Sequence, residues 1–149
     1  MSDELIKPSD QFRREIEPAL DDYLKDVGSE RLANNLARAI DHQVDWTFEY
    51  YKKVDPCRLN GAKEPKSFRR QLLPQCPELA IMNDLSDAAH HRFLDRPNDP
   101  ARITVTSTAA YSPVHSGQSD GVQLYIQATE TPFLSVARKA VDFWRQWKD

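Results

Sequence analysis

An uninterrupted helical pattern between residues 30 and 54 constrains the fold of this chain more than any other feature. Apolar or small side chains recur there every three or four residues over about five turns, the spacing that puts them on one face of an α-helix. The members of this stripe are Ala33, Leu36, Ala37, Ile40, Val44, Thr47, Phe48 and Tyr51. Ser29 precedes the pattern and suits an N-cap, and Asp55-Pro56 ends it. The sequence therefore predicts one long helix from Glu30 to Val54.

The second face of this helix carries four polar residues and a tryptophan. They are Arg38, His42, Asp45, Trp46 and Glu49. A tryptophan opposite the main stripe indicates either an inner bundle helix that is buried on two sides or a face that meets another subunit. We favour the second interpretation, which predicts a homodimer.

Shorter helical patterns flank the long helix. Residues 4–25 form a predicted first helix that starts near Pro8 and is kinked or broken at Pro18, because proline removes a backbone donor. After the long helix, residues 56–66 form a predicted loop with a turn at Asn60-Gly61. A short helix over residues 67–73 then ends at Pro74.

The segment 77–94 collects most of the polar candidates on one predicted amphipathic helix. Its apolar stripe consists of Leu79, Met82, Leu85, Ala89 and Phe93. Asp84, Asp87 and His91 lie on the opposite side, and Asn83 and His90 lie together on the flank.

The composition then changes towards β-branched residues. Residues 102–109 and 122–129 alternate in polarity, which predicts a β-hairpin at about 101–129 whose long loop is 112–121. Within this loop His115 receives no predicted role. Thr131 is the expected N-cap, and Pro132 the first residue, of a final helix whose buried side includes Phe133 and the tryptophans.

Composition limits the class of protein. The 149 residues are 40% hydrophobic and 29% charged with a formal charge of -3, which fits a single domain spanning residues 1–149. No apolar run reaches the roughly 20 residues that span a bilayer, so we expect a cytoplasmic protein without a membrane partner. Cys57 and Cys76 lack a CxxC spacing and are expected to be reduced thiols.

These patterns predict a mainly α fold, a bundle of four to five helices with one β-hairpin before the C-terminal helix. The predicted core is Leu36, Ile40, Val44, Tyr51, Leu79, Met82, Leu85, Phe93, Phe133, Val136, Ala140 and Trp144.

Two charged groups are candidates for a site. A basic group precedes and follows the helix at 77–94, and its candidate RNA-binding residues are Lys63, Lys66, Arg69, Arg70 and Arg96. The other group pairs carboxylates with histidines at bundle metal-site spacing, as in Asp87-x-x-His90 and His42-x-x-Asp45. A metal-dependent enzyme would use Asp84, Asp87, His91 and His42. The alternative interpretation of each group is an ordinary polar face that is exposed to solvent. We predict no metal ligand and no cofactor.

Nucleophilic catalysis has little support in the sequence. No G-x-S-x-G elbow, P-loop or G-x-G-x-x-G is present. Cys76 precedes a helix N-terminus, but His90 lies about 20 Å further along that helix, at 1.5 Å per residue. We therefore expect a structural role for Cys76.

The long helix, the basic connector and the run Asn83-Asp84-Leu85-Ser86-Asp87-Ala88-Ala89-His90-His91-Arg92 resemble small bacterial proteins of the HEPN type. Residues 30–96 carry this resemblance. It implies a helical bundle from a defence or toxin–antitoxin setting, where many members cleave RNA as dimers. The family's catalytic signature is an arginine followed a few residues later by a histidine. His90 or His91 matches the histidine and Asn83 only the polar neighbour, because no arginine stands where the signature needs it.

Three functions follow as hypotheses. The first is a non-catalytic binding module in a protein or RNA complex of the defence or toxin–antitoxin type. The second is a metal-independent ribonuclease whose catalytic residues would be His90, His91, Arg92 and Asn83, since such cleavage needs a base and a cation. The third is the metal-dependent bundle enzyme.

Overall fold

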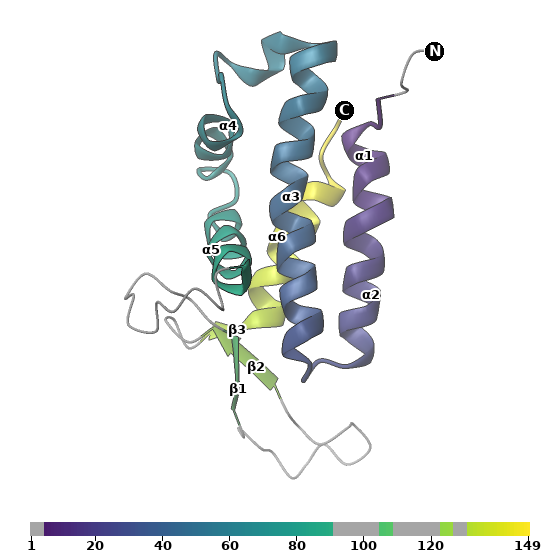
Figure 1. The fold of residues 1–149 in the computed structure, drawn as a ribbon, viewed down its shortest axis with the longest axis vertical. Helices are drawn as coiled ribbons and strands as arrows, with labels where there is room; N and C mark the ends of the chain where they lie inside the picture. The colour runs from purple at the N-terminus through teal and green to yellow at the C-terminus, as the bar shows by residue number, and fades with distance from the viewer. Residues whose placement is uncertain (1–4, 91–104, 109–122, 127–130) are drawn as a thin grey trace.

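A computed structural model describes residues 5–90, 105–108, 123–126 and 131–149. It confirms the predicted mainly α fold, a helical bundle with a small antiparallel sheet before the last helix (Figure 1). The last predicted turn of the helix at 77–94, the hairpin loop and His115 lie outside the described residues. In the described part of the chain, no helix combines the length and apolarity needed to cross a membrane.

The first helical rod passes through Pro18 without ending. It consists of α1 (Pro8–Gln11), a π-helical turn η1 (Phe12–Ile16) and α2 (Glu17–Lys25). Proline offers no N–H for the α-helical pattern, and a wider π turn just before it absorbs the mismatch. The predicted interruption is therefore a local widening of a continuous rod, which starts at Pro8 as expected.

The long helix α3 (Glu30–Val54) has the predicted bounds and lies at the centre of the bundle (Figure 1). The Ser29 hydroxyl accepts a hydrogen bond from the backbone N–H of Leu32 at 3.2 Å, so serine caps the helix as predicted. Every member of the predicted stripe is buried.

A tight connection follows α3. The 3-10 turn η2 (Pro56–Leu59) leads into Asn60 and Gly61, whose φ angles of 48° and 83° form the predicted turn. Helix α4 (Pro65–Leu72) starts two residues before its predicted bound, because Pro65 fits the first helical turn. Helix α5 (Glu78–His90) confirms the described part of the helix predicted at 77–94.

The sheet contains one strand that was not predicted. Strands β1 (Val105–Thr108) and β2 (Gln123–Ile126) form the expected antiparallel pair. Thr131–Pro132 forms a short strand β3 paired with β2, so the prediction that Thr131 caps the last helix is wrong. Pro132 is tolerated there because a sheet-edge residue need not donate a hydrogen bond. Helix α6 runs over Phe133–Arg145, with Pro132 as its N-cap.

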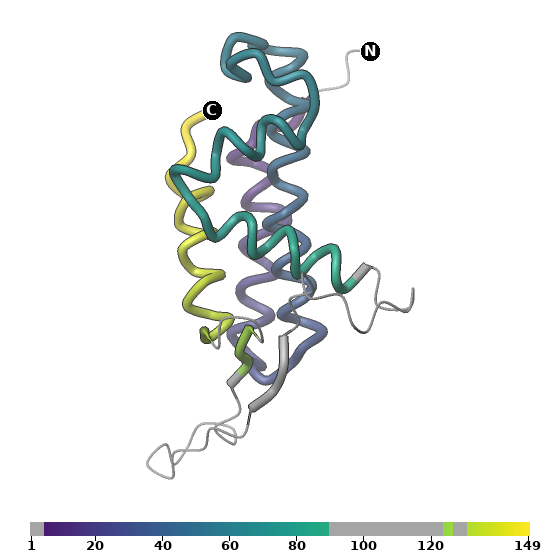
Figure 2. Tube along the Cα trace, turned by 90° about the vertical axis from the view of Figure 1, so that its left-hand side faces the viewer, coloured from purple at the N-terminus to yellow at the C-terminus, as the bar shows by residue number. Residues whose placement is uncertain are grey.

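The bundle packs around α3 on several sides. The α1–α2 rod runs antiparallel to α3 along one side of it (Figure 1). On the opposite flank of α3, α4 lies above α5 in the same view. Seen from that flank, α5 crosses the bundle obliquely and α6 lies beside it (Figure 2). Helix α5 packs against both α3 and α6, and β2 packs against α6.

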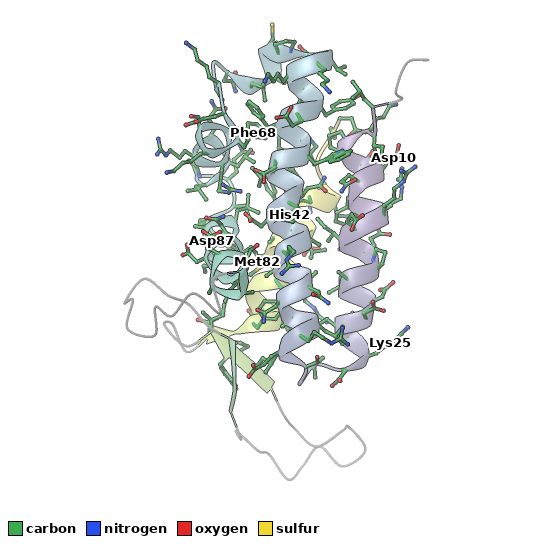
Figure 3. The ribbon with its side chains drawn as sticks, viewed as in Figure 1. Asp10, Lys25, His42, Phe68, Met82 and Asp87 are labelled. Carbon is green, nitrogen blue, oxygen red and sulfur yellow. The ribbon has the colours of Figure 1, made fainter. Side chains whose placement is uncertain are left out.

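The predicted core is confirmed wherever the structure describes it. Its described members are all buried: Leu36, Ile40, Val44, Tyr51, Leu79, Met82, Leu85, Phe133, Val136, Ala140 and Trp144. Phe93 lies outside the described residues. Met82 lies on the side of α5 that faces α3, whereas Asp87 lies on its outer side (Figure 3).

The second face of α3 meets the N-terminal segment of the same chain. The indole N–H of Trp46 donates to the carbonyl of Ile6 at 3.1 Å. The side-chain amide of Gln43 donates to the carbonyl of Pro8 at 2.8 Å. The tryptophan, still 38% exposed, is thus accounted for within one chain, and a homodimer needs an argument from another surface.

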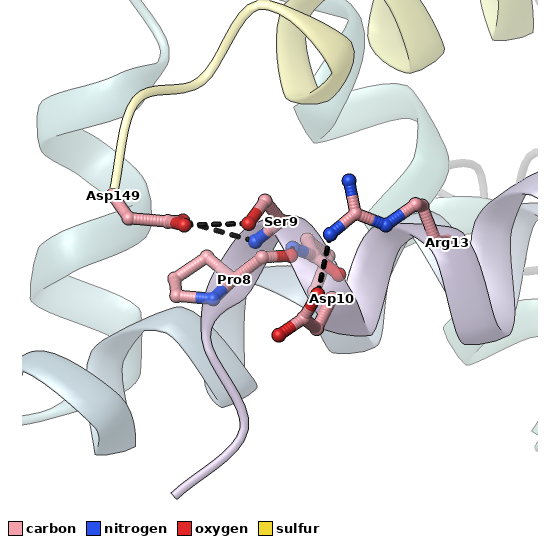
Figure 4. A network of polar contacts seen from close by, with 6 residues as sticks. Pro8, Ser9, Asp10, Arg13 and Asp149 are labelled. Carbon is pink, nitrogen blue, oxygen red and sulfur yellow. Dashed lines mark hydrogen bonds and ion pairs between the residues drawn. The ribbon is translucent and has the colours of Figure 1, made fainter.

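The segment after α6 joins the two ends of the described chain. The carboxylate of Asp149 accepts from the backbone N–H of Ser9 at 3.0 Å and from its hydroxyl (Figure 4). Close by, Trp147 donates to the Tyr51 hydroxyl at 2.9 Å. The Arg58 guanidinium stacks on the Tyr51 ring at 4.4 Å. Arg58 also donates from Nη1 to the carbonyl of Lys148 at 2.8 Å, so its side chain is held beside the C-terminal segment.

Candidate functional site

The candidate site is an open groove of about 800 Å³ between α3, α4 and α5. Charged and polar side chains line most of it. From α3 come Arg38, Asp41, His42 and Asp45. The chain thus brings together the polar face of α3, the basic helix α4 and the polar flank of α5, three segments that are far apart in sequence.

A buried ion pair organises the floor of the groove. The guanidinium of Arg69, on α4, donates from Nη2 to Oδ1 of Asp41 at 2.8 Å. Asn83, on α5, donates from Nδ2 to the same oxygen at 3.0 Å. Asp41 is only 7% exposed. Because a buried carboxylate is costly without partners, the two donors hold three helices in one register around it.

Arg69 lies towards α3 rather than towards solvent. Its Nη2 also lies 3.6 Å from Oδ1 of Asp45. Its Nε is buried and has no hydrogen-bond partner among the described residues. The arginine that we predicted as an RNA contact is thus committed to two carboxylates of its own chain.

Asp41 is the residue that sequence reasoning missed. It stands between Ala37 and Val44 at helical spacing, inside the apolar stripe of α3. A carboxylate at such a position must find a buried partner. This departure from the stripe was the signal that could have identified it.

The pKa values of two carboxylates, one on each wall of the groove, are raised mainly by burial. Burial raises the pKa of Asp45, and the Asp41 and Glu49 carboxylates raise it too, against the lowering effect of Arg69 and His42. Burial also raises the pKa of Asp84, helped by the nearby Asp87 and Asp41. The groove therefore holds negative charge at some cost to the fold.

Besides Arg38 of α3, which is also exposed, four exposed charges on α4 and α5 line the groove. Lys66 and Arg70 project from α4, and Asp84 and Asp87 from α5. None of the four forms an ion pair with another residue in the part of the chain that the structure describes. We call these residues the rim charges; they are free to meet a partner.

The predicted site residues are only partly brought together. Among the basic candidates, Lys63 is exposed in the connector before α4, and Arg96 lies outside the described residues. Among the ribonuclease candidates, Asn83 belongs to the buried network and His90 is the last residue of α5. His91 and Arg92 lie outside the described residues.

The residues of the hypothetical metal enzyme line one groove. Of the four predicted ligands, His42 comes from α3, and Asp84 and Asp87 come from α5. Asp45, which completes the His42-x-x-Asp45 spacing, lines the same groove. Within the described ranges, however, no three His, Cys, Asp or Glu side chains gather as ligands of one metal ion. The fourth predicted ligand, His91, lies outside those ranges.

Cys76 has the structural role that we predicted. It is 4% exposed, and neither it nor the exposed Cys57 forms a disulfide. Burial raises the pKa of the Cys76 thiol, and the Glu78 carboxylate raises it further. This outweighs the opposite effect of the helix N-terminus, so the thiol is a poor nucleophile.

Comparison of the chain with protein-family models, with curated proteins and with solved structures gave no match. The resemblance to HEPN-type proteins therefore stays a prediction. The function must be argued from the groove itself.

We expect Asp84→Asn to stabilise the fold at neutral pH. The raised pKa of Asp84 means that its ionised form disfavours folding, so wild-type stability is lost as pH rises above the ordinary value near 3.8. Partial exposure keeps the gain below about 1 kcal/mol. Urea titrations at several pH values, at protein concentrations low enough for the chain to be monomeric, measure this gain, which should vanish in acid. An equal gain from Asp22→Asn, on the exposed side of α2, would contradict this explanation.

Proposed function

We propose that this chain is a non-catalytic binding module that engages a protein partner through the rim charges of the groove. The proposal rests on the difference between the buried polar residues of the groove, which bind one another, and the exposed charges, which do not. Arg69 and Asn83 donate to Asp41, whereas Lys66, Arg70, Asp84 and Asp87 are exposed and form no ion pair within the described ranges.

The balance of charge favours protein over RNA. A phosphate chain that reached Lys66 and Arg70 would also pass the carboxylates of Asp84 and Asp87 on the facing wall. Repulsion there offsets the release of counterions from which RNA binding gains its affinity. A protein surface, in contrast, can offer both signs of charge.

The buried network also argues against catalysis. A ribonuclease needs a cation that is free to stabilise the charge developing on phosphate. Arg69 is the most buried cation that lines the groove, and its guanidinium already lies against Asp41 and Asp45. Lys66 and Arg70 have no ion-pair partner among the described residues, but both are exposed, and water screens their charges. The HEPN resemblance adds the expectation that the partner belongs to a bacterial defence or toxin–antitoxin complex.

Incubation with mixed-sequence RNA in the presence of a chelator tests this proposal. We expect no cleavage, and we expect RNA retention by the wild type to equal that of Lys66→Ala/Arg70→Ala. This pair is preferable to any variant of Arg69, because it leaves the buried network intact. His90→Ala and His91→Ala serve as the catalytic controls.

Two results would contradict the proposal. Cleavage that one histidine substitution abolishes while the fold persists would establish the ribonuclease. RNA binding that weakens with salt, and that Lys66→Ala/Arg70→Ala reduces for all RNA sequences alike, would establish an RNA module.

A further inference from the structure

The charges on the flank made by α4 and α5 are segregated by helix. Helix α4 contains Lys66, Arg69 and Arg70 and no acidic residue. Helix α5 contains Glu78, Asp84 and Asp87 and no lysine or arginine. Because α4 lies above α5 on this flank (Figure 1), the flank has a basic end and an acidic end. The two helices cross the flank in opposite directions (Figure 2).

An apolar centre separates the two ends. Leu73 follows α4, Ala80 lies in the first turns of α5, and both line the groove. Both side chains are half-buried rather than fully covered. Along the chain the order is therefore two exposed cations, an apolar centre and two exposed carboxylates.

This order is self-complementary under a two-fold axis. We infer that the flank made by α4 and α5 binds a second copy of this chain, related by a two-fold axis near Leu73 and Ala80. The axis brings the basic end of one copy onto the acidic end of the other. The inner charges then pair as Arg70 with Asp84 of the other copy, and the outer charges as Lys66 with Asp87.

The unpaired charges and half-buried apolar side chains of the single chain favour binding of a second copy. The rim charges have no ion-pair partner among the described residues. Asp84 lies near Asp87, and their mutual repulsion is relieved when cations of the second copy arrive. The half-buried Leu73 and Ala80 supply the apolar centre that protein interfaces have inside a polar rim.

This inference rests on the proposed function, since it names the partner of the same groove. Different experimental results would contradict the proposed function and the dimer. A chain that neither binds nor cuts RNA and stays monomeric retains the binding-module proposal and loses the dimer. A chain that cleaves RNA loses the proposed function, whatever its oligomeric state.

Sedimentation of the full chain with exchanged charges tests the inference. The wild type should sediment at twice the 17.2 kDa of one chain. Arg70→Glu and Asp84→Arg should each weaken the dimer by about tenfold or more, because each sets like charges against each other. Lys25→Glu, at the exposed end of α2 and remote from this flank, is the matched control and should remain dimeric (Figure 3).

Mixing the two single variants makes the test specific. In the mixed dimer the acid introduced at position 70 faces the base introduced at position 84, and the other inner pair is native. An equimolar mixture of Arg70→Glu and Asp84→Arg should therefore recover the dimer that neither forms alone. A side effect of either substitution on folding would not produce this recovery.

Three results would overturn the inference. The first is a monomeric wild type at concentrations up to about 1 mM, where even weak association is visible. The second is a dimer that both single variants leave intact. The third is a dimer that Trp46→Glu dissociates while the α4 and α5 variants do not, which would place the interface on the other face of α3.

Discussion

Replacing Arg69 by methionine is expected to lower the free energy of unfolding by about 3 kcal/mol. Removing one partner of a buried ion pair leaves an uncompensated charge, which typically costs about 3–5 kcal/mol. Asp41, at 7% exposure, would retain the hydrogen bond from Asn83 as its one side-chain contact from the described residues. We place the effect at the low end of the range, because the groove lets water approach.

Arg70→Met is the matched control for this prediction. The two arginines are neighbours on α4, but Arg70 is exposed and has no ion-pair partner in the described structure. At protein concentrations low enough for the chain to be monomeric, its substitution should change the free energy of unfolding by less than about 0.5 kcal/mol. Urea unfolding followed by circular dichroism measures both, and equal losses would show that Arg69 is no more buried or paired than its neighbour.

Removing both charges separates the cost of an orphaned carboxylate from the value of the pair. Asp41→Leu/Arg69→Met leaves no buried charge, and apolar replacement of a whole buried pair is often close to neutral. We therefore expect the double variant to be more stable than Arg69→Met alone. Additive losses from the two substitutions would mean that the side chains do not interact.

Truncating the core of the central helix is the second large effect. Ile40 and Leu85 are 0% and 1% exposed, on α3 and α5. Ile40→Ala or Leu85→Ala should each cost about 2–5 kcal/mol, because the surrounding bundle cannot fully collapse into the cavity. Thermal or urea unfolding measures the loss.

Leu24→Ala is the matched control for the core. Like Leu85, Leu24 is a leucine within a helix, but it lies on α2 and its side chain is 42% exposed. Its truncation should cost under about 1 kcal/mol, since little apolar surface returns to water. A loss below about 0.5 kcal/mol at both core positions would show that the packing of α3 against α5 is assigned wrongly.

Periodicity predicted the helices because it reports which side of a helix is buried. The bounds of α3 followed from a stripe, a serine cap and a proline stop that agree with one another. The strand at Thr131–Pro132 was missed because the local signal for a helix cap was good, and pairing with β2 outweighed it. Such pairing depends on residues far along the chain, and no local pattern reports it.

The groove was less predictable than the bundle. Its organising contacts join residues 41, 69 and 83, which meet only when α3, α4 and α5 adopt one register. The charge pattern around Arg69 and Arg70 indicated a basic surface. It did not show that one arginine side chain lies towards α3 and the other in solvent. Arg69 follows the buried Phe68 and lies towards α3, whereas Arg70 lies in solvent. The rim charges could be predicted as exposed, but not as one self-complementary flank.

The central claim is that the working surface of this protein is the flank made by α4 and α5. Two-dimensional amide NMR of the full chain, diluted from about 1 mM to about 10 μM to cover weak association, tests it most directly. We expect concentration-dependent shifts at Lys66, Arg70, Ala80 and Asp84, and none around Trp46. Shifts confined to the α1–α3 face, or no shifts on dilution together with α4 shifts on adding RNA, would contradict it.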